Sequence, residues 1–214
     1  GCCMLNAPMD NRDVRFAINY AINRENLIQA VLYGLGEAPA TFVGPTEFGF
    51  DTAGYEVSKQ DLDKAAEHIA ASGLPTPIEL ALTYESNRFW PQMAELLKSD
   101  LEAVGFAVTL DPQDAGTYWG KVLGGESQLN MNQRSLWVPD PDNKVTLLFS
   151  GDGSAQGETG IVGAMPEYSA KMDELLVAGR QETDLTRRAE IYKEIQDLLV
   201  EELPYIMLAY YTKP

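Results

Sequence analysis

The chain has 214 residues, a mass of 23.6 kDa and a net charge of −16, because 32 acidic residues face 16 lysines and arginines. This charge repels phosphate backbones and anionic lipid headgroups, so nucleic acids and membrane surfaces are poor candidate partners. The composition, 45% apolar and 22% charged, is that of a globular chain. No apolar run approaches the ~20 residues of a membrane-spanning helix, so we expect none.

The two cysteines, Cys2 and Cys3, are adjacent in the sequence. Adjacent cysteines close only a strained ring and cannot cross-link distant parts of a fold. The alternatives are a lipidated terminus and two half-buried thiols in a strand, and the apolar character of free cysteine favours the thiols. The residues before Asn6 show neither the basic nor the apolar segment of an export signal.

The first third of the chain is predicted to be mainly helical. Apolar residues recur at helical spacing over residues 13–22 and 24–32. Prolines and glycines among aromatic residues indicate a long ordered loop over residues 37–58. A short helix that begins near Ser58 or Asp61 then ends at Ala71.

The firmest local prediction is a βαβ unit at about residues 78–110. Residues 78–84 alternate between apolar and polar side chains, as a strand does. Met93, Leu97 and Leu101 form a helical apolar stripe that ends at Gly105. Residues 106–110 form the second strand, and the crossover should be right-handed.

The second half of the chain alternates short elements and loops. We expect a brief helix over 118–123, a strand of mixed polarity over 129–137, a turn over 139–143 and a short apolar segment over 145–149. A glycine-rich loop over 150–163 should be mobile or should cover something. Helices beginning near Pro166 and Asp184 and an apolar strand over 205–210 complete the chain.

The motifs of common enzymes are missing from the sequence. His68 is the only histidine, and no nucleophile elbow or phosphate-binding loop is present. The segment that begins at Asp140 resembles the start of a calcium loop but carries Lys144 where a ligand is needed. Paired carboxylates cannot be tested by spacing, because they need only meet in space. We therefore predict no enzyme, no metal site and no cofactor.

Polar and aromatic residues gather around the predicted strand at 129–137. The group comprises Tyr118, Trp119, Asn130, Asn132, Arg134, Trp137 and Asp140. An aromatic platform with amides and charges of both signs is a common way to hold a polar small ligand. A tryptophan anchored in the core beside a polar strand edge is the alternative.

Several stretches, in order, resemble the family 5 extracellular solute-binding proteins, the ligand receptors of ABC importers for dipeptides, oligopeptides and related solutes. They are Asn6 followed by DNRDVRFAI and AINR, then GLGEAPA, DKAA, LEAVGF, the PDPDN turn at 139–143, DLTRRAEIYKEIQ and ELPYI. The match covers nearly the whole chain, and the order and spacing of its pieces are more specific than any one piece.

The resemblance implies an α/β fold in which two lobes close on a ligand around a hinge. Residues 1–214 look like a single lobe, the second one, with a mixed sheet flanked by helices in the type II periplasmic-binding-protein fold. The first lobe of the same protein would then be a partner, and its absence would account for the missing export signal. Half a cleft should bind ligand weakly or not at all, although the chain carries its own βαβ core and should fold.

The resemblance also suggests ligand-binding residues. Peptide-binding members pair the ligand ammonium with an aspartate three residues after a tryptophan, and Trp137 and Asp140 keep that spacing. Here Asp140 also begins the turn that contains Asp142, so the segment looks shortened. Either Asp140 both begins the turn and pairs with the ligand ammonium, or the partner of the ammonium is lost. Arg134 would suit a ligand carboxylate, or a structural salt bridge, and Asn132 completes the predicted set.

The predicted function is therefore capture of a peptide or similar polar small solute between two lobes and its delivery to ABC importer permease subunits. By resemblance the protein is periplasmic or extracellular. A free-standing interaction domain and a carboxylate-based hydrolase are the alternatives. A raised carboxyl pKa would favour the hydrolase, and an exposed apolar edge would favour the interaction domain.

Overall fold

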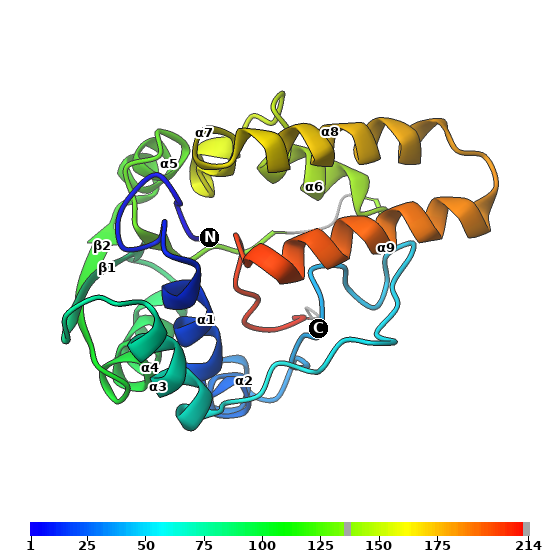
Figure 1. Cartoon of the computed structure of the whole chain (residues 1–214). Coiled ribbons are helices and arrows are strands. Elements are labelled where there is room, and N and C mark those ends of the chain that lie inside the picture. Colours follow the sequence, from blue (N-terminus) through cyan, green and yellow to red (C-terminus); the bar gives the residue numbers. More distant parts are fainter. Residues whose placement is uncertain (135–137, 212–214) are drawn as a thin grey trace.

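A computed structural model describes residues 1–134 and 138–211 of the chain (Figure 1). A small sheet and helices α1 to α4 form one end of the molecule, and the longer helices α8 and α9 extend from the other. The labelled N-terminus lies between these two parts (Figure 1).

The sheet is built around the predicted βαβ unit. Strand β1 (Ile78–Glu85) pairs in parallel with β2 (Phe106–Gln113), and α4 (Trp90–Glu102) connects them. On its other side β1 pairs in parallel with β3 (Leu129–Asn130), so the strand order is β2-β1-β3. The α/β class and the βαβ unit are confirmed. The named strands are all parallel, and the antiparallel pairing of a mixed sheet is present as a single bridge between Cys2 and Leu129.

Three N-terminal helices begin where polar caps predict. They are α1 (Arg12–Ala21), α2 (Arg24–Leu32) and α3 (Leu62–Ala71). The side chains of Asn11, Asn23 and Asp61 accept hydrogen bonds from the first backbone N–H groups of these helices, which otherwise have no intrahelical partner. The cap at Asp61, one of the two predicted starts, is confirmed.

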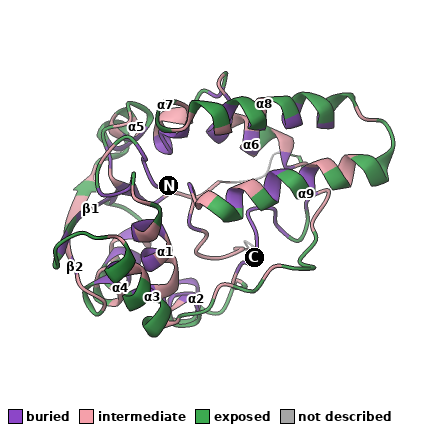
Figure 2. Ribbon diagram, viewed as in Figure 1, coloured by how far each residue is buried: buried purple, intermediate pink, exposed green. Residues whose placement is uncertain are grey.

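The second half of the chain is mainly helical. Its elements are α5 (Ala115–Leu123), α6 (Asp142–Phe149), the 3-10 turn η1 (Gln156–Glu158), α7 (Ile161–Ala164), α8 (Pro166–Gln181) and α9 (Leu185–Glu202). Helices α8 and α9 lie side by side (Figure 1). Exposed residues cover much of the outer surface of α8 in Figure 2, whereas its buried residues face α6 and α9.

Buried apolar side chains form two clusters. The sheet cluster is built from β1, β2, α1, α2 and α4, and includes Leu82 and Leu101, neither of which is exposed. The helical cluster is built from α6, α8 and α9, and includes Phe149 and Ile195. We use these two names below, because the candidate site lies where the clusters meet.

Three sequence predictions are wrong in extent. The strand expected over 129–137 ends at Asn130, and residues 135–137 lie outside the described residues. The strand expected over 205–210 is extended backbone with one bridge, between Glu37 and Tyr210, so it does not join the sheet. The loop at 150–163 contains η1 and the start of α7, and Glu158 is fully buried there.

Candidate functional site

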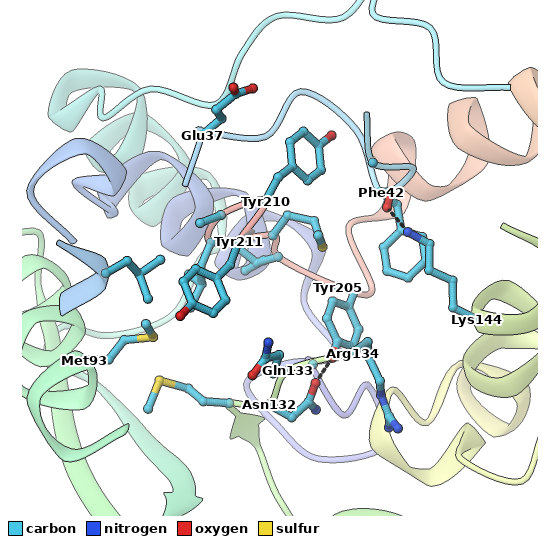
Figure 3. Close-up of a pocket in the computed structure, with 18 of the residues that line it drawn as sticks. Glu37, Phe42, Met93, Asn132, Gln133, Arg134, Lys144, Tyr205, Tyr210 and Tyr211 are labelled. Carbon is cyan, nitrogen blue, oxygen red and sulfur yellow. Dashed lines mark hydrogen bonds between the residues drawn. The ribbon is translucent and has the colours of Figure 1, made fainter. Parts of the chain in front are cut away.

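A cavity of about 310 Å³ lies where the sheet cluster and the helical cluster meet (Figure 3). Its walls come from the loop at 42–47, the start of α4, the segment that follows β3 and the C-terminal segment at 205–211. In the part of the chain that the structure describes, six aromatic residues line it: Phe42, Phe89, Trp90, Tyr205, Tyr210 and Tyr211. The loop and the C-terminal segment are held together by Tyr210, whose hydroxyl donates to the carbonyl oxygen of Thr41 at 2.6 Å.

The wall that follows β3 carries a polar network. Strand β3 pairs with the central strand β1 of the sheet. Residues 130–134, at the end of β3 and directly after it, form part of the cavity lining. The amide of Asn132 donates to Oδ1 of Asn130, at 3.2 Å, and to the carboxylate of Glu158. Tyr205 donates its hydroxyl hydrogen to Oδ1 of Asn132, and burial raises the pKa of this tyrosine well above its ordinary value of 10.0. Asn132 therefore links the wall that follows β3 to the wall formed by the C-terminal segment (Figure 3).

Arg134 forms an ion pair with Glu158, whose side chain is 0% exposed. The guanidinium also lies over the ring of Trp119, 5.2 Å from its centre. Burial alone would lower the pKa of Arg134, but Glu158 and Tyr205 together outweigh burial and raise it. Of the two roles predicted for Arg134, a structural salt bridge is the one that the structure contains.

A second buried ion pair lines the cavity beside Phe42. Nζ of Lys144 donates to the Glu47 carboxylate at 2.5 Å and to the carbonyl oxygen of Phe42 at 2.6 Å. The Glu47 side chain is 1% exposed and that of Lys144 is 12% exposed. The same carboxylate accepts from the backbone N–H of Gly44, so α6 and the loop at 42–47 are joined through this pair. Burial lowers the pKa of Lys144, and Glu47 opposes that effect.

The turn before α6 faces helices α8 and α9, and neither of its aspartates lines the cavity. Oδ2 of Asp140 pairs with Nη1 of Arg188 at 2.8 Å. Oδ1 of Asp142 accepts from Nε of Arg180 at 2.9 Å and from the Tyr192 hydroxyl at 3.2 Å. The structure thus brings Asn132 and Arg134 together and places Asp140 and Asp142 elsewhere. Trp137, the remaining predicted site residue, lies outside the described residues.

Comparison with known proteins decides the family. The profile described as "Bacterial extracellular solute-binding proteins, family 5 Middle" matches residues 3–156, which is more than half of the chain. The chain belongs to this family.

Named relatives of this chain are peptide-binding proteins. It is 27% identical to the dipeptide-binding protein of Escherichia coli K12 over 213 residues, a match that covers 96% of this chain and 38% of that protein. It is also 27% identical to di/tripeptide-binding protein 1 of Pseudomonas aeruginosa UCBPP-PA14, with the same coverage. The chain therefore spans well under half the length of these relatives.

Solved structures share the fold of this solute-binding protein. A dipeptide-binding protein from Pseudoalteromonas sp. SM9913, in complex with Met-Leu, superposes with a TM-score of 0.85 at 26% identity, over 98% of this chain and 41% of that one. The DppA protein of Helicobacter pylori, in complex with the peptide STSA, superposes with a TM-score of 0.84 at 23% identity, over 98% of this chain and 40% of that one. The periplasmic-binding-protein fold is confirmed.

Within the described residues, no group of three or more histidine, cysteine or acidic side chains is arranged to hold a metal ion. Among residues 1–134 and 138–211, every helix is too short or too polar to span a lipid bilayer.

The sequence did not indicate three of the residues that shape the cavity of this solute-binding protein. Glu158 belongs to the loop that was predicted to be mobile or to cover something, and it is buried beneath Arg134. Glu47 and Lys144 are 97 residues apart, and Lys144 drew attention only because it spoils a calcium loop. A lone acidic residue inside an apolar loop such as 42–48 is the signal that could have identified Glu47, because a buried carboxylate needs a partner.

Proposed function

We propose that this chain forms part of the ligand-binding cleft of an ABC importer's solute-binding protein, and that the cavity in Figure 3 takes part of a peptide or similar polar small solute. The observation that carries the proposal is the place of the cavity. It is lined by residues inside the matched family segment, such as Asn132 and Lys144, and its volume lies at the small end of the range of small-molecule sites.

The wider assignment rests on membership of the family. We propose that residues 1–214 fold as a single lobe, which corresponds to the second lobe of a two-lobed receptor. That receptor would act in the periplasm or outside the cell and would deliver its solute to permease subunits. Closure of two lobes would bury the solute and exclude water from the polar network around Asn132, which strengthens its hydrogen bonds. The proposal contains no catalytic step.

The proposed ligand-binding residues are Asn132, Arg134, Trp137, Asp140 and Asp142. Asn132 and Arg134 belong to the cavity wall, which supports the first two. Asp140 is 33% exposed beside Arg188, so a ligand ammonium would have to share its carboxylate with that guanidinium. Asp142 would act through its place in the same turn, where its backbone N–H donates to the Asp140 side chain at 3.0 Å.

The proposal is tested with the product of the native gene. The protein is purified without denaturation, its bound solutes are identified by mass spectrometry, and peptide binding is measured by calorimetry. We expect the bound solutes to be peptides or related amino-bearing molecules. We also expect Asn132→Leu to weaken binding at least about tenfold, because it removes the hydrogen bonds that join the segment after β3 to the C-terminal segment.

The matched control is Asn26→Leu, which alters an exposed asparagine on α2 outside the cavity. Unchanged binding by Asn132→Leu, or the same loss in both variants, would contradict the proposed site. Absence of any bound or titratable peptide would contradict the peptide class.

A further inference from the structure

The charged side chains of the cavity are almost all neutralised inside the protein. Among the described residues, four charged side chains contribute to its lining: Glu37, Glu47, Arg134 and Lys144. A charged ligand group that enters such a site gains affinity only where it meets an opposite charge that is free to pair with it. The state of each of the four therefore determines which ligand groups the cavity accepts.

Arg134 is already paired. Its partner, Glu158, is fully buried, and it is held by Asn132 as well as by the guanidinium. In Figure 3 the Arg134 side chain runs away from Tyr210 and Tyr211, so its charge is directed away from the aromatic part of the cavity. A ligand carboxylate would have to compete with Glu158 for this cation.

Lys144 is also paired. Its ammonium contacts the Glu47 carboxylate and the Phe42 carbonyl oxygen, and it lies over the Phe42 ring, 4.5 Å from its centre. Oε2 of Glu47 in turn accepts from Lys144 and from the backbone N–H of Gly44, whereas Oε1 is buried without a hydrogen-bond partner among the described residues. The pair adds no net charge to the cavity.

The fourth charge stands at the rim. Glu37 is exposed, and its backbone pairs with Tyr210 in both directions, at 3.0 and 2.9 Å. Its carboxylate in Figure 3 points away from Asn132 and Gln133. Water can solvate this carboxylate, so it exerts a screened field on the interior of the cavity.

Apart from Thr46 and the amide side chains of Asn130, Asn132 and Gln133, the other side chains that line the cavity in the described residues are aromatic and aliphatic. Trp90 and Met93 from α4, Met131 after β3 and Ile206 from the C-terminal segment are all buried or nearly so, and tyrosine rings complete the surface. We propose that this cavity is a specificity pocket for a large uncharged apolar group of the solute, such as an aliphatic or aromatic side chain, and that it discriminates against charged groups of either sign. This inference rests on the proposed function, since it names the group that a bound peptide places here.

The test compares four dipeptides that differ in one side chain. Alanyl-leucine, alanyl-asparagine and alanyl-aspartate have side chains of nearly equal size, and alanyl-lysine adds a cation. Each is titrated into the product of the native gene up to millimolar concentration, and the indole signal of Trp90 is followed in nitrogen–proton correlation spectra. We expect alanyl-leucine to bind at least about tenfold more tightly than alanyl-aspartate or alanyl-lysine, because burial of an unpaired charge is costly.

Two variants test the reason for the selectivity. Glu158→Gln and Glu47→Gln keep the shape of the side chain and free Arg134 and Lys144 from their partners. Each variant should raise the affinity for alanyl-aspartate, relative to the affinity for alanyl-leucine, by about tenfold. Glu174→Gln, which removes an exposed carboxylate on α8, makes the same charge change outside the cavity and should leave the ratio unchanged.

The possible outcomes separate this inference from the proposed function. If alanyl-aspartate or alanyl-lysine binds as tightly as alanyl-leucine, the specificity is wrong although the cavity binds peptides. If no dipeptide shifts the Trp90 signal, the proposed peptide site fails, and the inference fails with it. Because the dipeptide comparison uses the unmodified chain, a variant that does not fold leaves the test intact.

Discussion

Buried ion pairs shape the cavity at the scale of single residues. Glu47 and Lys144 are both largely removed from water, so each would carry an uncompensated charge without the other. The intact pair contributes little net stability, but removal of either partner is costly because it leaves the other charge buried alone. The loop at 42–47 and helix α6 are consequently hard to move apart.

Lys144→Met is expected to lower the free energy of unfolding by about 3 kcal/mol, because it leaves the Glu47 carboxylate buried with a backbone N–H as its remaining donor. Urea denaturation followed by circular dichroism measures the loss. Lys98→Met is the matched control, since Lys98 and Glu102 form an exposed pair at 3.5 Å that should contribute less than about 0.5 kcal/mol. Equal losses in both variants would show that the pair in the cavity is not buried in solution.

Arg188 joins elements that are distant in the sequence. From α9 it reaches the turn before α6 through Asp140, and its Nε donates to the carbonyl oxygen of Gly179 in α8 at 2.8 Å. Its guanidinium also lies over the ring of Phe48 at 4.6 Å. A planar cation with five donors is needed to make all of these contacts at once.

Arg188→Lys should therefore lower stability by about 1–2 kcal/mol although the charge is kept, because an ammonium cannot replace the stacked and forked contacts. Thermal unfolding provides the measurement. The neighbouring Arg187 is exposed, and Arg187→Lys should change stability by less than about 0.5 kcal/mol. If the two variants have the same melting temperature, Arg188 does not hold α8, α9 and the turn together.

At the scale of the whole molecule, several tyrosines are buried in both parts of the structure. Burial raises the pKa values of Tyr118, Tyr168 and Tyr192 above 10.0, and the Tyr118 hydroxyl donates to the carbonyl oxygen of Met131 at 2.6 Å. In the unfolded chain these phenols ionise at their ordinary pKa. The unfolded state therefore releases protons first as the pH rises.

The stability contributed by these tyrosines should be fully present below pH about 10 and should decline as the pH rises from there toward their folded-state pKa values, by about 1.4 kcal/mol per pH unit for each tyrosine. Melting temperatures across this range measure the slope. Tyr118→Phe should make the slope shallower, whereas Tyr33→Phe should not, because Tyr33 is 83% exposed. A melting temperature that does not change above pH about 10 would contradict the burial of these phenols.

The sequence predicted elements that depend on local patterns. The βαβ unit was predicted because alternation over 78–84, an apolar stripe and Gly105 all agree, and the cap at Asp61 was predicted from the preferences of helix N-termini. The apolar run at 205–210 resembles a strand, but in the described structure its one bridge is to Glu37. An apolar pattern typical of a strand indicates which side chains are buried, but it does not indicate whether a neighbouring strand is available for pairing.

The candidate site was predicted only in part, because its contacts are distant in the sequence. The polar residues after β3 were identified, and Asn132 and Arg134 do line the cavity. The partner of Arg134 is 24 residues away, in a segment that was predicted to be mobile or to cover something. The spacing of residues along the sequence does not reveal an ion pair between side chains this far apart. The assignment of ligand-binding roles to Trp137, Asp140 and Asp142 stays a prediction.

The meeting of two apolar clusters at one cavity has a consequence for cooperativity. Trp90 and Met93 belong to the sheet cluster, whereas Phe42 belongs to the helical cluster, and all three face the same space. A solute seated there contacts both clusters and is lost when either one opens. Occupancy then couples their opening equilibria, so amide hydrogen exchange of the two clusters should slow together as solute is added.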